Sequence, residues 1–223
     1  MTVSALRVAG LAIGFALVGL IGLVAVFEGP GTYRDIAHAQ GIDGATFRSP
    51  PDRRWIVDLN VLVDLHERTL AYVLGAAPAL PAFATTALPL FDADERSHMA
   101  DVRAVFQAAK FSFVAGLVIV LGVLRWTDRA QRMRLIRAAA MAAGFGVSVL
   151  AIAAAVAFDP LFLLFHEVFF PQGNFLFGPD SNLLTLYPDP YWYGVTLRIG
   201  LTFVGVMAGV ALAATATLRR AHR

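Results

Sequence analysis

The sequence of 223 residues contains no cysteine, which excludes disulfide bonds, thiol nucleophiles and cysteine-ligated zinc. Charged residues are also scarce: they make up 15% of the chain, against 58% hydrophobic residues and a mean hydropathy of +0.67. Soluble domains carry about 25% charged residues, so this composition indicates a membrane protein. The basic residues stand in short runs beside apolar segments. They therefore indicate membrane topology rather than nucleic-acid binding.

Two hydrolase motifs are also missing. The sequence has no G-x-S-x-G nucleophile elbow. The zinc-protease motif H-E-x-x-H begins at His166 and Glu167 but needs a histidine at position 170, which is Phe170. A metal site built from His98, His166 and carboxylates stays open, because separated histidines suit zinc or iron. No specific spacing supports such a site, and we expect neither a metal nor a cofactor.

Four apolar stretches are long enough to cross a bilayer core of about 30 Å, which needs roughly 20 helical residues. They are residues 6–27, 105–125, 138–159 and 193–218. The first is longer than the apolar part of a signal peptide, and Ala37-His38-Ala39, the nearest small-x-small site, lies far downstream. We therefore expect a retained anchor. The sequence predicts an all-α integral membrane protein with four transmembrane helices, forming one membrane domain over residues 1–223.

Arginines predict the orientation of these helices. The loop 126–137 and the chain end after 218 are rich in arginine, whereas the loop 160–192 has no lysine or arginine. Because cytoplasmic loops collect basic residues, both termini are expected in the cytoplasm of a multi-pass protein of the cell membrane. The segment 28–104 and the loop 160–192 then lie on the outer side.

The outer segment 28–104 is too long for a simple turn. At 100° per residue, the stretch 53–74 predicts an amphipathic helix lying in the lipid interface or against the spans. Its apolar face consists of Trp55, Ile56, Leu59, Leu62, Val63, Leu70 and Val73. The following stretch 78–91 is apolar but rich in proline, which favours an irregular lid or interfacial loop.

Polar residues gather at the outer ends of two predicted spans. Asp92 or Asp94 is expected to cap a helix that leads into the second span. Glu95, His98 and Asp101 lie three residues apart and share one face of it. This spacing also fits a solvated helix end. Two cations, Lys110 and Arg198, fall inside predicted spans, where they either snorkel or face a polar interior.

The stretches "ERSHMADVRAVF" and "FHEVFFPQGNFLFGPDSNLLTLYPDPYW" resemble the signature of a four-span membrane family. This family includes the lipoprotein intramolecular transacylase Lit. The resemblance covers the four-span layout, with a loose match in the first loop, and departs at Phe175, where the family more often has tryptophan. It implies that an acyl chain moves from the glyceryl group of a lipoprotein's N-terminal cysteine to the α-amino group of that cysteine. It also implies that His98 and His166 are catalytic.

Ester aminolysis needs a neutral amine, and an α-amino group with a pKa near 8 is largely protonated at neutral pH. One histidine could accept the amine proton while the other donates to the leaving glyceryl oxygen. The other candidates fall into two roles. Glu95, Asp101 and Glu167 are candidates to orient an imidazole, and Asn174, Arg96 and Arg198 to stabilise the oxyanion.

The expected partners are a diacylglyceryl-modified lipoprotein and membrane lipid, and the sequence leaves the oligomeric state open. Two alternatives also stay open. One is a non-catalytic subunit or scaffold of an envelope complex, and the other is a phospholipid acyltransferase or hydrolase of the same architecture. A transporter is disfavoured, because the sequence shows no inverted repeat and no paired broken helices.

Overall fold

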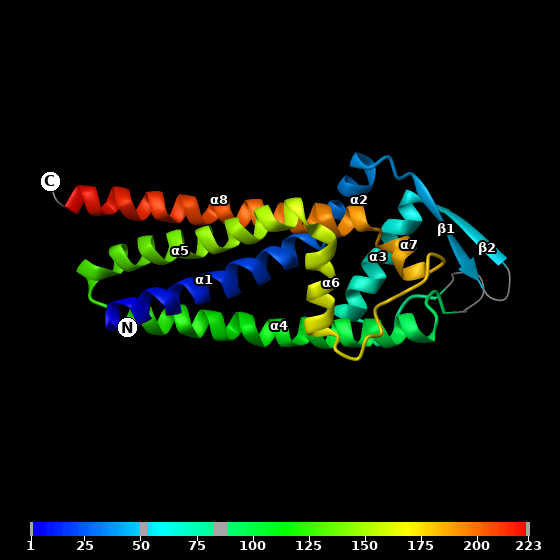
Figure 1. Cartoon of the computed structure of the whole chain (residues 1–223), viewed down its shortest axis with the longest axis horizontal. Coiled ribbons are helices and arrows are strands. Elements are labelled where there is room, and N and C mark those ends of the chain that lie inside the picture. Colours follow the sequence, from blue (N-terminus) through cyan, green and yellow to red (C-terminus); the bar gives the residue numbers. More distant parts are fainter. Residues whose placement is uncertain (1, 50–52, 83–88, 222–223) are drawn as a thin grey trace. The chain divides into compact units, whose positions relative to one another are not determined.

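The computed structural model describes residues 2–49, 53–82 and 89–221. Its four long helices are α1 (Val3–Phe27), α4 (Ala93–Arg125), α5 (Arg129–Val156) and α8 (Asp189–Ala221), as Figure 1 shows. Each is long and apolar enough to cross a membrane, which confirms the four transmembrane helices expected from hydropathy. Both α4 and α8 begin before the apolar stretches at 105 and 193. Their first turns therefore carry charged and polar residues.

The chain forms two compact units. The first consists of Met1–Val26, Ala109–Val156 and Thr196–Arg223, and the second of Phe27–Ala108 and Ala157–Val195. Helices α4 and α8 contribute to both units. The first unit contains the apolar parts of the long helices. The second contains the shorter helices and the only sheet found in the described residues.

In the first unit, α1 packs against the three other long helices. Leu11 of α1 is buried against Leu135 and Ala139 of α5, and α1 also contacts a cluster around Phe203 of α8. Close approach to α4 depends on glycine. A Cβ atom at Gly14 would lie 2.6 Å from a methyl of Val120. Small residues at helix crossings let backbones approach closely, which is a common way to pack helices inside a membrane.

The first unit also leaves large apolar side chains uncovered. Phe111 of α4 is 77% exposed and Phe145 of α5 is 74% exposed. Exposed apolar surface of this kind is costly in water but suits a lipid environment. The packing of this unit therefore agrees with its composition.

The second unit is built around α3 (Leu59–Val73). Helices α2 (Pro30–Ala39) and α7 (Asn182–Leu186) contact it, as does an antiparallel hairpin of β1 (Gly44–Ser49) and β2 (Arg53–Asp58) (Figure 1). Helix α6 (Phe158–Phe169) follows α5 after a break at Ala157. Pro160 is compatible with α6 because it lies in the first turn, where a backbone N–H has no partner within the helix.

The amphipathic helix predicted for 53–74 is wrong in its first six residues. These residues form β2, and Asp58 caps α3 by accepting a hydrogen bond from the backbone N of Val61 at 3.1 Å. In β2, Val57 is 6% exposed while the adjacent Ile56 is 79% exposed. This is the two-residue alternation of a strand. The cross-strand pair Phe47 and Trp55 brings two aromatic rings to a centroid distance of 6.2 Å.

The proline-rich stretch 78–91 was expected to be irregular. Residues 78–82 and 89–91 contain no helix, and Ala82 forms a single antiparallel bridge with Pro89. Residues 83–88 lie outside the described residues. For these six residues the expected irregular structure stays a prediction.

Candidate active site

His98 lies in the second turn of α4, before the apolar run that begins at 105, and the start of this helix is tightly fixed. Asp92 accepts a hydrogen bond from the N of Glu95 at 2.8 Å, and Glu95 accepts one from the N of Asp92 at 2.9 Å. This reciprocal pair is a capping box with aspartate at the cap. It confirms that Asp92 is the helix cap. It also fixes the first turn of α4, which immediately precedes His98.

Glu95 also connects α4 to α7. Its second oxygen accepts hydrogen bonds from the hydroxyl of Ser181 and, at 2.9 Å, from the N of Leu183. The side chain is 1% exposed. No hydrogen bond joins Glu95 to a histidine in the described residues. The structure thus uses this carboxylate to join two helices, a role that the spacing alone did not reveal.

His166 lies on α6, and its proton position follows from one hydrogen bond. Its Nδ1 is 2.7 Å from the carbonyl oxygen of Phe162, one turn earlier. Because a carbonyl oxygen can only accept, Nδ1 must donate the proton. In the neutral ring, Nε2 therefore carries the lone pair and can accept a proton.

The two histidines lie close together although 67 intervening residues separate them in the sequence. Their ring centroids are 5.9 Å apart and the ring planes differ by 19°. Phenylalanines surround both rings. The ring centroids of Phe170 and Phe177 lie 4.6 Å and 5.5 Å from that of His98. Those of Phe162 and Phe175 lie 4.3 Å and 5.2 Å from that of His166. Phe175, the point of departure from the family pattern, thus contacts one of the two imidazoles.

A polar network borders His98. Asp101, one turn further along α4, accepts hydrogen bonds from the side-chain amides of Gln172 at 2.6 Å and Asn174 at 2.7 Å. These two residues belong to the segment that follows α6. Asp101 therefore holds this segment beside His98, as expected of a residue on the same helix face.

Burial dominates the electrostatics of His98. Its side chain is 5% exposed. Burial lowers the pKa of His98 to about 4, and the charge of His166 lowers it as well, while Asn174 and Asp101 raise it. Desolvation disfavours the charged imidazolium. His98 is therefore neutral at physiological pH.

The remaining predicted site residues differ in their surroundings. Glu167 is exposed, and its carboxylate makes no hydrogen bond within the described residues. Arg96 donates to the carbonyl of Phe91 at 2.6 Å, and two residues along a helix place it about 200° around α4 from His98. Arg198 and Lys110 belong to the first unit. Among the predicted supporting residues of the second unit, the structure thus brings Asp101 and Asn174 to the histidine pair.

A third histidine, which is buried, was missed by the sequence analysis. His66 of α3 is 1% exposed. Its Nε2 lies 2.9 Å from the carbonyl oxygen of Glu28 and its Nδ1 lies 3.2 Å from the hydroxyl of Tyr187. The ring stacks on Tyr33 at a centroid distance of 4.6 Å. A signal was present, because position 66 continues the buried stripe of Leu62 and Thr69 at helical spacing.

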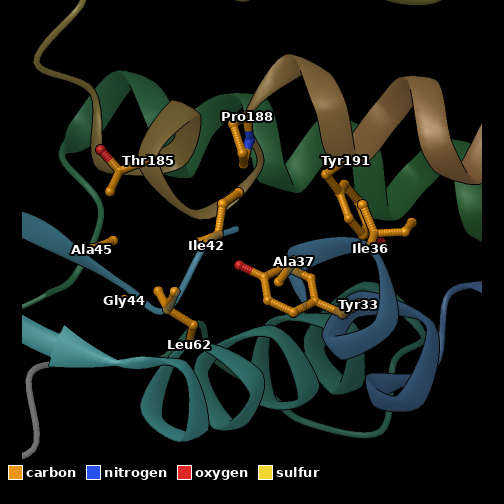
Figure 2. Close-up of a pocket in the computed structure, with 10 residues that line it drawn as sticks. All are labelled: Tyr33, Ile36, Ala37, Ile42, Gly44, Ala45, Leu62, Thr185, Pro188 and Tyr191. Atoms are coloured by element: carbon orange, nitrogen blue, oxygen red, sulfur yellow. The ribbon is translucent and has the colours of Figure 1, made fainter. Parts of the chain in front are cut away.

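A cavity of about 230 Å³ lies near this third histidine, bordered by α2, α3, the hairpin and the start of α8 (Figure 2). Its walls are mostly apolar, with Ile36, Leu62 and Pro188 among them, and Tyr33 and Tyr191 form one side. Neither His98 nor His166 lines this cavity. The described residues also contain no group of three or more His, Asp or Glu side chains that could hold a metal ion.

The sequence model of one protein family, lipoprotein intramolecular transacylase Lit, matches residues 55–192. This range contains both histidines and more than half of the chain. The chain belongs to the Lit family. It is accordingly a membrane acyltransferase of the intramolecular transacylase type, as the resemblance implied. A comparison with curated proteins gave no significant match.

Solved structures of the membrane integral lipoprotein intramolecular transacylase Lit from Bacillus cereus are similar to the chain. One of them shares 15% sequence identity, covers 97% of this chain and 98% of its own, and superimposes with a TM-score of 0.68. Two variants of that protein, each with one histidine replaced, match at 13% and 15% identity with TM-scores of 0.63 and 0.62. They cover 98% and 97% of this chain, and 94% and 92% of their own. At this level of identity the comparison shows that the fold is shared.

Proposed function

We propose that His98 and His166 together catalyse acyl transfer within a diacylglyceryl-modified lipoprotein. The α-amino nitrogen of the N-terminal cysteine attacks the carbonyl carbon of a glyceryl ester on the same molecule. A carbon–nitrogen bond forms, the ester carbon–oxygen bond breaks, and the proton lost by nitrogen ends on the glyceryl oxygen. The products are an amide and a free hydroxyl, which together constitute the lyso form.

The observation that carries this proposal is the pairing of the two rings at 5.9 Å. A non-catalytic scaffold gives no reason for two histidines from distant segments to meet. His166 offers a lone pair on Nε2, and His98 is held neutral by burial. Each ring can therefore take up a proton from the amine or pass one to the leaving oxygen. General acid–base catalysis of this kind contributes about 10²–10⁴-fold.

No nucleophile on the enzyme is needed, because both reacting groups belong to one substrate molecule. Holding them together converts the attack into an intramolecular step. The phenylalanines around the rings exclude water from this step and offer an apolar surface to acyl chains. This arrangement favours transfer to the amine over hydrolysis.

We further propose that the site faces the outer side of the membrane and that both termini are cytoplasmic. The support is the distribution of charge. Arginines concentrate between α4 and α5 and at the end of α8, and the segment carrying His166 has none. The positive-inside tendency then assigns the arginine-rich loop to the cytoplasm.

Mass spectrometry of lipoprotein N-terminal peptides tests the proposal in cells that depend on this enzyme for lyso-form lipoproteins. Cells with the wild type are expected to yield N-acyl S-monoacylglyceryl peptides. Cells with His98→Ala or His166→Ala are expected to retain the diacyl form. His38→Ala is a matched control, because His38 is exposed on α2.

Equal amounts of lyso form from all four proteins, at equal enzyme levels in the membrane, would reject the catalytic pair. Release of free fatty acid from phospholipid by the purified wild type, without acyl transfer to lipopeptide, would instead favour the phospholipid alternative.

A further inference from the structure

The amide of Asn174 has only one possible orientation. Its Nδ2 lies 2.7 Å from a carboxylate oxygen of Asp101 and 3.4 Å from the hydroxyl of Ser97. A carboxylate only accepts hydrogen bonds, so the NH₂ group must face Asp101. Gln172 donates to the same carboxylate oxygen and reinforces its position. The carbonyl oxygen Oδ1 of Asn174 therefore points the other way.

Two buried polar atoms remain unpaired in this region. Oδ1 of Asn174 and Nδ1 of His98 are buried, and neither has a hydrogen-bond partner within the described residues. Asn174 nevertheless raises the pKa of His98 as a hydrogen-bond acceptor does, so the two side chains lie within reach of each other but are imperfectly aligned. Buried polar atoms are almost always paired. An acceptor oxygen and a ring nitrogen that can carry a proton satisfy each other.

We propose that Asn174, held by Asp101, is a positioning residue that keeps the proton of His98 on Nδ1 and leaves Nε2 free for the reaction. This inference rests on the proposed function of His98. The chain Asp101–Asn174–His98 orients one imidazole through a side chain from another segment. The other imidazole, His166, is oriented by a peptide carbonyl of its own helix. Both rings then present Nε2.

This assignment changes the role expected for Asn174. An oxyanion needs hydrogen-bond donors, but the NH₂ group of Asn174 is already used by Asp101. The part of Asn174 that faces His98 is an acceptor. Asn174 therefore acts on the histidine rather than on the developing charge.

The first test measures acyl transfer to the amine of a diacylglyceryl lipopeptide by purified, lipid-reconstituted enzyme. Asn174→Ala is expected to lower kcat by about 10²-fold with KM within about threefold, because loss of tautomer control impairs proton transfer rather than binding. Asp101→Asn is expected to lower kcat by about tenfold, since it allows the amide of Asn174 to rotate. Asp180→Asn is the matched control, because Asp180 lies in the same loop but pairs with exposed Arg48.

The sharper test exchanges the two polar residues. Asn174→Asp alone sets two carboxylates against each other and is expected to be as impaired as Asn174→Ala. Combining it with Asp101→Asn restores a donor facing an acceptor and places a carboxylate against Nδ1. The double variant is expected to recover at least tenfold in kcat. In the pH–rate profile of the double variant, the acid limb should move to higher pH. The adjacent anion favours the imidazolium and therefore raises the pKa of His98. Asp101 on α4 and His166 on α6 are the other charged groups that act on His98.

A second measurement separates this inference from the proposed function. Nitrogen-15 NMR of histidine-labelled enzyme in detergent reports which ring nitrogen carries the proton. His98 is expected as the Nδ1–H tautomer in the wild type and as a mixture in Asn174→Ala. An unchanged tautomer in Asn174→Ala would overturn the positioning role of Asn174. A folded double variant whose kcat does not recover would overturn it as well. Full activity of His98→Ala beside an Asn174-dependent tautomer would overturn the proposed function alone.

Discussion

The second unit holds two buried histidines that resemble each other in burial and differ in bonding. His66 is 1% exposed and His98 is 5% exposed, and burial lowers the pKa of each to about 4. Both ring nitrogens of His66 lie within hydrogen-bond distance of protein oxygens. By contrast, Nδ1 of His98 is buried and has no hydrogen-bond partner within the described residues.

This comparison shows that a shifted pKa alone does not mark a catalytic group. Burial lowers the pKa at both positions, and perturbed pKa values of this kind are also found at structural sites. Spare hydrogen-bonding capacity distinguishes them, because a ring whose nitrogens are both occupied cannot exchange a proton with a substrate. His66 therefore stabilises the fold, and His98 is available for chemistry.

The largest expected effect separates the two histidines by activity. His98→Gln is expected to lower kcat for lipopeptide acyl transfer by about 10²–10⁴-fold, the range of general acid–base catalysis. His66→Gln is expected to retain kcat within about tenfold while lowering the melting temperature. Rates and thermal unfolding, measured on the same detergent preparations, provide the check. Loss of activity in both variants without loss of stability in either would contradict a structural role for His66 and a catalytic role for His98 alone.

The next effect concerns carboxylates. Glu95→Ala leaves the Ser181 hydroxyl and the backbone N–H groups of Asp92 and Leu183 without their acceptor. We expect the free energy of unfolding to fall by about 4 kcal/mol, since each unsatisfied buried donor costs about 1–3 kcal/mol. Glu167→Ala removes an exposed carboxylate, and the loss should stay below about 0.5 kcal/mol. Chemical denaturation in mild detergent compares the two, and equal losses would contradict the structural role of Glu95.

A pH-dependent effect follows from His66. Its pKa is about 4 in the folded protein, against about 6.5 for an exposed histidine. Above pH 6.5 both states are neutral. Between pH 6.5 and 4 the unfolded chain binds a proton that folded His66 does not, so stability is lost as the pH falls. The stability advantage of wild type over His66→Gln should shrink by on the order of 3 kcal/mol from pH 7 to pH 4. A difference constant with pH would show that His66 titrates normally.

The smallest expected effect concerns the cavity in Figure 2. Ala45→Leu places three additional carbons at its wall. Because neither His98 nor His166 lines this cavity, kcat and KM are expected to change by less than about twofold. A marked rise in KM for lipopeptides with longer acyl chains would assign the cavity to the substrate.

Part of the fold could be predicted from local properties. Hydropathy over about 20 residues identified four membrane-crossing helices, because a span must be apolar along its whole length. The start of α4 was predicted with two candidate caps, Asp92 and Asp94, because capping involves only neighbouring residues, and the structure selects Asp92. The hairpin was missed, although the β-branched and aromatic residues of "GATFRS" and "RRWIVD" on either side of the turn-forming "PPD" are typical of paired strands. The sequence analysis placed Trp55 and Ile56 on one face of a helix, whereas they belong to a strand, in which adjacent side chains point to opposite faces.

The site was only partly predictable, for a different reason. His98 and His166 were named through a family resemblance, and their spacing along the chain did not bring them together. The three acidic candidates Glu95, Asp101 and Glu167 were indistinguishable in the sequence. The structure gives them three surroundings: a buried helix junction, a contact with Asn174, and solvent. Which carboxylate meets which partner depends on contacts between distant segments.

The sequence by itself determined that this protein is a four-span membrane enzyme of a recognisable family, because hydropathy and local motifs are properties of neighbouring residues. Only the tertiary structure decided that the rings of His98 and His166 lie 5.9 Å apart, that Glu95 bonds to α7, and that the amide of Asn174 donates to Asp101. The physical reason is that burial and hydrogen-bond direction arise from packing between segments far apart in the chain. These two properties decide whether a polar side chain supports the fold or the chemistry.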